Sequence, residues 1–499
     1  MTNIVSLSLI ISLLMSPIFI LIIYFLPEKH ARVRAWMPVL ASGSVFLSLL
    51  SILPYSLNDL IFESPSILFT PDITMIFRID LFGLYFGLIA SLIWLLASIY
   101  SMGYMIGEHS LRRFYCFFTA CLYFTLGISF AGNLFTLFIF YELVTISGYP
   151  LIFHEETEQA RKASLKYLYY ALSGDAFVLF SVFMTYHVTG SLNLDKTGAY
   201  IYSSMNSFYI LIILTILGFG VKAAIMPLHG WVADAHPAAP SPASALLSGV
   251  LVNVGILGMA RIFYNSIGST LLYMANFPKN LIPLALFTIT AASIIAINQD
   301  NLKRRLAYST IGQLSYIVLG LAMNNKKGLE GGLVHIANHA FMKATLFLCA
   351  GAIIKETGIK NISEMKGLSK RMPVTMVVFA IASFGMIGMP PLCGFVSKWV
   401  LGEGAIEAGE VIYIAILLIS SLLASVYFLP IIYNAFFQKG EFQKTFDKWY
   451  EECSVYMLIS MITGVLLVII FGIFVLFPGS PLYIVTRIAD KWIMNPSMY

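Results

Sequence analysis

Charged residues are scarce in this chain. Asp, Glu, Lys and Arg make up only 11% of its 499 residues, whereas a soluble domain carries about 25%. Hydrophobic residues make up 59%, and the mean hydropathy is +0.84. A chain of this composition has too few polar side chains to cover a surface in water. The composition therefore excludes a soluble globular protein and predicts an integral membrane protein.

Cysteine is also scarce, and its spacing matches neither a zinc site nor a disulfide framework. Four of the five cysteines lie in apolar stretches, where small buried thiols are common. The sequence contains no cofactor motif either. We therefore expect no metal, no cofactor and no redox catalysis in this chain itself. The cysteines are Cys116, Cys121, Cys349, Cys393 and Cys453.

Long apolar stretches recur along the whole chain. A helix needs about 20 apolar residues to cross a bilayer, and the spanning segments must be helical because lipid offers no partner for free backbone groups. The prediction is an all-α membrane protein with about 14 transmembrane helices. The first stretch lacks a basic flank and a cleavage site, which favours a retained span. The expected spans are 4–26, 35–54, 81–103, 114–131, 133–152, 164–189, 207–228, 242–264, 281–298, 306–323, 330–354, 373–389, 410–436 and 455–478.

The basic residues indicate the orientation of these spans. With the N-terminus outside, 19 of the 30 lysines and arginines fall in inner loops and 7 in outer segments. Cytoplasmic loops carry the excess of positive charge, so this distribution predicts that both termini lie outside.

Two ionisable residues lie deep in apolar segments, where each costs about 2.5–3.5 kcal/mol on insertion scales. Glu142 has no other charge within ten residues on either side. Lys222 lies five residues before Pro227, which breaks a helix and exposes backbone groups of the kind that bind ions in transporters. Two other interpretations stay open, since Glu142 could only hold a helix in place and Lys222 could extend to the interface.

A third polar feature follows helical spacing. His335, His339 and Lys343 are four residues apart, which places them on one face of one span. A lone buried histidine is more often a core residue, but three such groups on one face favour a proton relay along a hydrated path. The two histidines could also chelate a metal, although no nearby cysteine or carboxylate completes a site.

Lys398 follows a second interrupted span, which Pro390 and Pro391 break. Corresponding interruptions in two halves of a transporter indicate its ion sites. Lys222 is in the seventh span and Lys398 in the twelfth, and an offset of five spans predicts two inverted five-helix repeats. The expected segments are 1–113 (three N-terminal helices), 114–265 (first repeat), 280–437 (second repeat) and 438–499 (C-terminal helix and tail).

Four further ionisable residues have weaker support from the sequence. Asp175 could lie near Glu142 or near Lys166, with function and structure equally favoured. The others cluster in a proline-rich stretch, where non-helical backbone must be covered by protein or line a water-filled cavity. They are His229, Asp234 and His236.

Three long motifs carry a resemblance to a known family. They are PLHGWVADAHPAAPSPASALLSG (227–249), QDNLKRRLAYSTIGQLSYIVLG (299–320) and GMPPLCGFVSKW (388–399). With the fourteen spans, they make nearly the whole chain resemble the antiporter-like subunits shared by respiratory complex I, membrane-bound hydrogenases and Mrp-type Na⁺/H⁺ antiporters. The length is similar to that of the D-type Mrp subunit and the corresponding hydrogenase subunits.

The resemblance implies two inverted five-helix bundles with discontinuous helices seven and twelve. It also implies roles. Glu142 would pair with Lys222, the three residues of span eleven would form the connecting relay, and Lys398 would exchange protons with the outer side. Many relatives carry a lysine in span eight where this chain has Asn253, whose amide can orient water but cannot carry a proton.

The sequence therefore predicts a proton-translocating subunit of a multi-subunit complex in the cytoplasmic membrane of a prokaryote. Whether Na⁺ is exchanged, and whether the complex is an oxidoreductase, stays open. A stand-alone cation/proton antiporter fits the spans equally well. A membrane enzyme acting on a quinone or lipid is less favoured because no nucleophile, metal set or phosphate loop accompanies the histidines. A structural scaffold explains the buried charges poorly.

Overall fold

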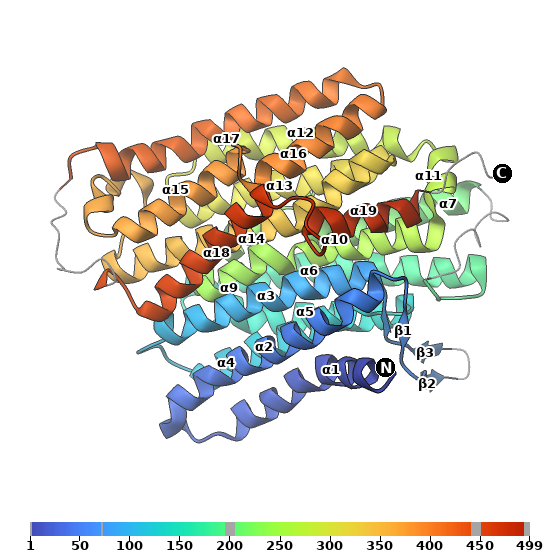
Figure 1. Ribbon diagram of the computed structural model, residues 1–499, viewed down its shortest axis with the longest axis horizontal. Coiled ribbons are helices and arrows are strands. Elements are labelled where there is room, and N and C mark those ends of the chain that lie inside the picture. The colour runs from blue at the N-terminus through green and yellow to red at the C-terminus, as the bar shows by residue number, and fades with distance from the viewer. Residues whose placement is uncertain (1, 71–72, 195–204, 441–450, 494–499) are drawn as a thin grey trace.

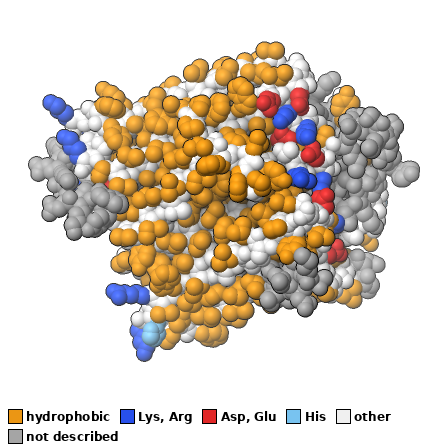
Figure 2. Space-filling view, viewed as in Figure 1, with side chains coloured by type: hydrophobic (Ala, Val, Ile, Leu, Met, Phe, Trp, Pro, Cys, Tyr) orange, Lys and Arg blue, Asp and Glu red, His pale blue; other side chains and the backbone are white. Residues whose placement is uncertain are grey.

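The computed structural model describes residues 2–70, 73–194, 205–440 and 451–493. Long helices that run alongside one another make up most of it (Figure 1). Ten described helices are long and apolar enough to cross a membrane, and three shorter apolar helices accompany them. Figure 2 shows the matching surface, on which hydrophobic side chains cover most of the visible face. The predicted all-α membrane protein is confirmed at this level.

The first half of the chain contains the helices of the predicted N-terminal segment (1–113) and of the predicted first repeat (114–265), followed by α11. Their bounds are α1 Thr2–Phe25, η1 Glu28–His30, α2 Ala31–Ser56, α3 Leu81–Tyr104, α4 Leu111–Ser129, α5 Leu134–Ile152, α6 Glu158–Thr189, α7 Met205–Lys222, α8 Val232–Ala238, α9 Ser241–Leu246, η3 Leu247–Leu251, α10 Asn253–Ala260, η4 Arg261–Ile267 and α11 Ser269–Met274.

The second half of the chain forms the remaining helices. Their bounds are α12 Phe277–Ile297, α13 Leu302–Met323, α14 Lys326–Thr357, η5 Ile362–Glu364, η6 Leu368–Lys370, α15 Pro373–Ile387, α16 Cys393–Glu407, α17 Val411–Phe437, α18 Val455–Ile473 and α19 Pro481–Trp492.

The segment 55–78, which the sequence presents as a loop, forms two small antiparallel pairs at one end of the bundle (Figure 1). Strand β1 (Phe62–Glu63) pairs with β4 (Arg78–Ile79), and β2 (Ile67–Thr70) pairs with β3 (Ile73–Met75). Each strand is at most four residues long, which is too short for a reliable alternation pattern in the sequence.

Both predicted interruptions are present. Helix α7 ends at Lys222 and α8 begins at Val232, with Pro227 between them. Helix α15 ends at Ile387 and α16 begins at Cys393, with Pro390 and Pro391 between them. Proline lacks a backbone N–H and cannot continue a helix, so the last carbonyl groups before each break need other donors.

Helix α14 lies at the centre of the bundle. It packs against α13, α15, α16, α18 and α19 of its own half and against α3 and α9 of the other. Every residue from 328 to 353 is buried. Polar side chains within residues 328–353 can therefore reach neither lipid nor the bulk solvent directly.

A buried ion pair joins three helices near the strands. Asp80 caps the N-terminus of α3 by accepting a hydrogen bond from Gly83 N at 2.8 Å. Two guanidinium nitrogens of Arg261, at the start of η4, donate to the same carboxylate, and one also donates to Ser129 O of α4 at 3.0 Å. The Arg261 side chain is buried. The pair fixes α3 to α4 and to the π-helical turn.

Replacing Asp80 with Ala should destabilise the protein by about 3–5 kcal/mol, because it leaves a buried guanidinium without its counter-charge. The measurement is the midpoint of thermal unfolding in detergent. The control is Asp59→Ala, since the Asp59–Lys491 pair (2.5 Å) lies at the same end of the molecule but is exposed to solvent. Equal midpoints for the two variants would contradict a structural role for the buried pair.

Candidate functional site

Lys222 ends α7 inside the bundle and is almost fully buried. Its ammonium donates to Asp175 Oδ1 of α6 at 3.0 Å and to Tyr141 O of α5 at 2.9 Å. The Nζ atom also lies 3.1 Å from the centroid of the Tyr141 ring, which is a cation–π contact. The helix break begins directly after this residue, so the charge sits where regular hydrogen bonding stops.

Asp175, rather than Glu142, is the direct ionic partner of Lys222. Its other oxygen accepts a hydrogen bond from Thr145 Oγ1 of α5 at 2.8 Å, and the side chain is almost fully buried. Glu142 lies near enough to interact electrostatically with both Asp175 and Lys222. Two carboxylates and one ammonium group therefore lie close together here. Of the two positions that the sequence allows for Asp175, the structure shows the one near Glu142.

Lys166, the alternative partner for Asp175, lies elsewhere. It pairs with Asp234 of α8 at 2.7 Å, and Arg304 approaches the same carboxylate at 3.9 Å. The side chains of Lys166 and Asp234 are 41% and 35% exposed. Asp234 is therefore part of a surface ion network at the end of the first interrupted helix.

The two histidines of the proline-rich stretch differ in their burial. His229 is partly buried, with its ring 6.4 Å from that of Tyr308. His236 is completely buried, and its ring packs edge-on against Phe347 of α14 at 5.2 Å. His236 thus places an imidazole between the first interrupted helix and the central helix.

The three predicted residues of α14 are all completely buried. His335 Nδ1 lies 2.7 Å from Ser397 Oγ of α16, and its Nε2 lies 3.0 Å from Gln313 Oε1 of α13. Lys343 donates to Leu306 O at 2.9 Å and to the Ser309 hydroxyl. Within the described residues, Lys343 therefore has neutral oxygen acceptors and no carboxylate in hydrogen-bond contact.

His339 lies between these two residues and has a different environment. Its ring centroid is 6.1 Å from that of His335. Neither of its ring nitrogens, nor either nitrogen of His236, has a hydrogen-bond partner in the part of the chain that the structure describes. Buried polar groups are normally satisfied by protein or by ordered water, so these nitrogens are where the hydrated passage expected from the sequence would place water.

Asn253 also has a buried polar atom without a hydrogen-bond partner among the described residues. Its Nδ2 donates back to Gly249 O at 2.8 Å, whereas its Oδ1 is buried without a partner among the described residues. The side chain lies at the first turn of α10, directly after the π-helical turn η3. A buried carbonyl oxygen at this point can accept a hydrogen bond from water but cannot relay a proton by itself.

Lys398 bridges the second interruption. Its ammonium donates to Met386 O and Ile387 O, both at 2.9 Å, and to Ser421 Oγ of α17 at 3.1 Å. The first two acceptors are among the last carbonyls of α15, where a cation is favourable. Lys222 and Lys398 therefore share one feature, an ammonium group at a broken helix, although Lys398 is only partly buried and contacts no carboxylate among the described residues.

Two cations that the sequence places in an inner loop are instead buried in α13, because this helix begins at Leu302 and not at residue 306. Lys303 donates to the backbone oxygen of Ala239, the residue directly after α8, at 2.9 Å. Arg305 donates to Gln299 O at 2.7 Å and to Tyr427 O at 2.9 Å. Sequence reasoning missed both, together with the serines and the glutamine that bind the α14 relay.

No group of three or more metal-binding side chains occurs among the described residues. A cavity of about 620 Å³ lies at the end that carries the strands, and its walls include Asp80, Arg261, Lys491 and Trp492. It contains none of the residues that the sequence singles out for ion movement. What the buried residues can do is hold and pass protons, since lysine, histidine and carboxylate side chains all exchange them.

The fold and this interior define the class as a multi-pass membrane protein with an ionisable core. A family model described as "NADH:quinone oxidoreductase/Mrp antiporter, TM" matches residues 131–424. The chain belongs to this family.

Individual relatives agree with this assignment. The chain is 36% identical over 352 residues to NADH-quinone oxidoreductase subunit N of Desulforudis audaxviator, which covers 68% of this chain and 69% of that protein. It is 32% identical to the D-type subunit of a Na(+)/H(+) antiporter of Bacillus subtilis, covering 73% of this chain and 74% of that protein.

Two solved structures share the fold over almost the full length. A chain of the Mrp complex from Dietzia has a TM-score of 0.86 at 20% identity and covers 100% of this chain and 99% of its own. A chain of the archaeal membrane-bound sulfane sulfur reductase has a TM-score of 0.83 at 24% identity, covering 98% and 97%.

The unsatisfied ring nitrogens generate a direct prediction. A high-resolution cryo-EM map should show ordered water in contact with His236 and His339, because leaving a buried polar atom unpaired costs about 1–3 kcal/mol. His335 is the internal control, since protein groups already bind both of its ring nitrogens. A dry, fully packed space around the first two rings would contradict the hydrated passage.

Proposed function

We propose that this chain is a proton-translocating subunit of a multi-subunit membrane complex. It moves protons along a buried row of Glu, Lys and His side chains. The supporting observation is the row itself. Glu142, Asp175 and Lys222 lie at the first broken helix, Lys398 lies at the second, and α14 carries three ionisable groups between them. Asp175, Lys222 and the three groups of α14 are buried, whereas Glu142 and Lys398 are partly buried. Ionisable groups inside a membrane protein are costly, and function is the usual reason that they are kept.

The proposed path begins at the first broken helix. A proton that enters from the inner face reaches Lys222, whose hold on that proton depends on the two carboxylates beside it. The Asp175 contact at 3.0 Å stabilises the ammonium form, and Glu142 adds to this when it is ionised. A change in the position or charge of Glu142 would therefore favour release of the proton from Lys222.

The middle of the path runs through α14. Lys343 with its neutral oxygen partners can give up a proton more readily than an ion-paired lysine, because no negative charge in contact stabilises its ammonium form. His339 and His335 follow it along the same helix, and water joins them to one another and to His236. The path ends at Lys398, which exchanges with the outer side. Asn253, near the junction of the two halves, orients water but carries no proton.

The finer architecture belongs to the same proposal. It comprises fourteen spans, two inverted five-helix repeats at 114–265 and 280–437, and both termini outside in the cytoplasmic membrane of a prokaryote. The paired interruptions of α7/α8 and α15/α16 support the repeats. Figure 2 supports the orientation, because Lys and Arg dominate at one end of the visible face, whereas acidic and basic side chains mix at the other.

The proposed setting is a complex with other membrane subunits. Relatives and structural neighbours carry the names of subunits of quinone oxidoreductases, Na⁺/H⁺ antiporters and a sulfane sulfur reductase complex. These names support partner subunits over a stand-alone antiporter. The names are compatible with two driving forces, a redox reaction in the partner subunits or an ion gradient. Whether Na⁺ is exchanged depends on which of the two drives the complex.

Replacing Lys222 or Glu142 with Ala should abolish proton movement while the complex still assembles. Either change removes a member of the charged group that controls proton release at the first broken helix. The measurement is proton flux through the purified complex in liposomes, read with a pH-sensitive dye. Lys162→Ala is the matched control, because this lysine also lies on α6, the helix of Asp175, but is solvent-exposed and pairs with Glu158. Normal flux in both Lys222→Ala and Glu142→Ala would refute the proposal.

Gentle purification through a tag on this chain should recover it with several other membrane subunits. Absorbance and metal content of that preparation then identify the driving force. Iron–sulfur, flavin or nickel signals would indicate a redox-driven pump, and their absence beside several small apolar subunits would indicate an Mrp-type antiporter. A chain that emerges alone and still transports protons would instead establish the stand-alone antiporter.

A further inference from the structure

Glu330 is a buried carboxylate that the proposed path does not use. It lies in the second turn of α14, and only 2% of its side chain is exposed. One oxygen, Oε2, accepts a hydrogen bond from Lys327 Nζ at 3.1 Å. The other, Oε1, is enclosed and has no partner among the residues that the structure describes. An ionisable group in this state requires a physical reason.

The position of Glu330 relates it to the end of the relay. His335 follows five residues later on α14, which is about 7.5 Å along the helix axis. On α16, which packs along α14, Glu403 follows five residues after Lys398. Each of the last two relay residues therefore has a carboxylate beyond it, toward the end of the bundle where α14 begins and α16 finishes.

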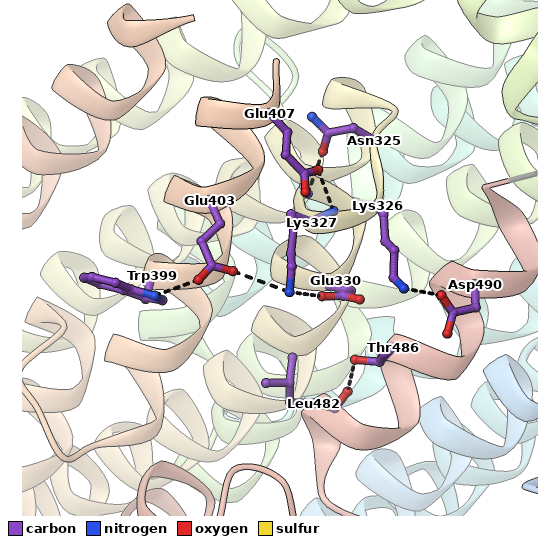
Figure 3. Close-up of polar contacts among 11 residues, drawn as sticks. Asn325, Lys326, Lys327, Glu330, Trp399, Glu403, Glu407, Leu482, Thr486 and Asp490 are labelled. Atoms are coloured by element: carbon purple, nitrogen blue, oxygen red, sulfur yellow. Dashed lines mark hydrogen bonds and ion pairs between the residues drawn. The ribbon is translucent and has the colours of Figure 1, made fainter. Parts of the chain in front are cut away.

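One lysine connects these two carboxylates. Lys327 Nζ lies 3.1 Å from Glu330 Oε2 and 3.5 Å from Glu403 Oε2, as the dashed lines in Figure 3 show. The Lys327 and Glu403 side chains are both 39% exposed, whereas Glu330 is enclosed. The ammonium group thus stands between a buried oxygen and a solvent-exposed one.

The charged groups next to Lys327 and Glu330 have contacts of their own. Lys326 forms an ion pair with Asp490 of α19. Glu407 accepts a hydrogen bond from the backbone N–H of Lys327 at 3.3 Å, which is favourable at a helix N-terminus. Trp399 Nε1 donates to Glu403 at 2.9 Å. In this cluster the four carboxylates of Glu330, Glu403, Glu407 and Asp490 stand beside the two ammonium groups of Lys326 and Lys327.

The packing of α14 on α16 separates Glu330 from solvent. A Cβ atom on Gly331 would lie 2.6 Å from Leu401 N, and one on Gly404 would lie 2.3 Å from Gly328 N. The two helices therefore touch through their backbones at this level. The polar groups at this contact are the Glu330 carboxylate and the long side chain of Lys327, which reaches the surface.

We propose that Glu330 is the terminal proton carrier at this end of the path, and that Lys327 controls its opening to solvent. This rests on the proposed function. The Glu330 carboxylate accepts a proton through water from His335 or Lys398 and becomes neutral. Lys327 then keeps only Glu403 as its ionic partner and moves toward the surface. The proton passes to external water, the carboxylate is restored, and Lys327 returns.

The test measures proton flux of the intact complex in liposomes while the pH on the α14 N-terminal side is varied. Glu330→Gln should lower the rate on the order of 100-fold, the low end for a positioned proton-transfer group, and flatten the dependence on that pH. Glu330→Asp keeps a carboxylate and should recover flux and pH dependence. Asp490→Asn is the control, because it removes a carboxylate at the same end that only pairs with Lys326.

Three results would overturn the inference. The first is normal flux and pH dependence in Glu330→Gln. The second is an equal loss in Asp490→Asn, which would assign the effect to packing at this end. The third is no recovery by Glu330→Asp in an assembled complex. Lys222→Ala, measured in parallel, separates the two proposals: if it abolishes flux while Glu330→Gln does not, only the role of Glu330 fails.

If the Glu330→Gln complex does not assemble, a second variant, Glu403→Gln, tests the same proposal. Glu403→Gln alters a partly exposed side chain and should preserve the fold, but it removes the surface partner of Lys327. The ammonium then stays on Glu330, and flux should fall several-fold with the same flattened pH dependence. Unchanged flux in assembled Glu403→Gln would overturn the control by Lys327.

Discussion

The structure depends on the cost of removing charge from water. An isolated charge at the centre of a bilayer is unfavourable by several kcal/mol, so each buried ionisable group must find a counter-charge, a carbonyl group or water. The protein uses all three. Lys222 has Asp175, Lys398 has the last carbonyls of α15, His335 has a serine and a glutamine, and water is the proposed partner of His339.

The two interrupted helices provide part of this solvation, because a broken helix presents carbonyl groups that a regular helix would use internally. Helix α14 connects the two breaks through the middle of the bundle. An ion-paired lysine, Lys222, and a lysine bound only by neutral oxygen atoms, Lys343, therefore belong to the same row of ionisable groups. A proton can move along such a row because the stability of the charged form differs from one position to the next, and because a neighbouring charge can change that stability.

Much of this arrangement follows from the sequence. The apolar stretches predict the all-α membrane architecture, Pro227, Pro390 and Pro391 predict both breaks, and the spacing of His335, His339 and Lys343 predicts that they share one face of one helix. The partner of Lys222 does not follow, because it depends on how α5, α6 and α7 rotate against each other, and Asp175 and Glu142 both come within range. Lys303 and Arg305 were misplaced by a shift of four residues in the start of α13. Glu330 resembles an ordinary helix-end charge until the packing of α16 shows that it is buried.

The most direct test of a proton path through the central helix is the flux of the assembled complex with Lys343→Arg. Arginine keeps the positive charge and the hydrogen-bond donors, but its guanidinium group does not release a proton in a protein. Lys343→Arg therefore separates a residue that carries protons from one that supplies a fixed charge. The predicted result is an assembled complex in which flux is lost. Flux that continues at the wild-type rate would contradict a path through the central helix.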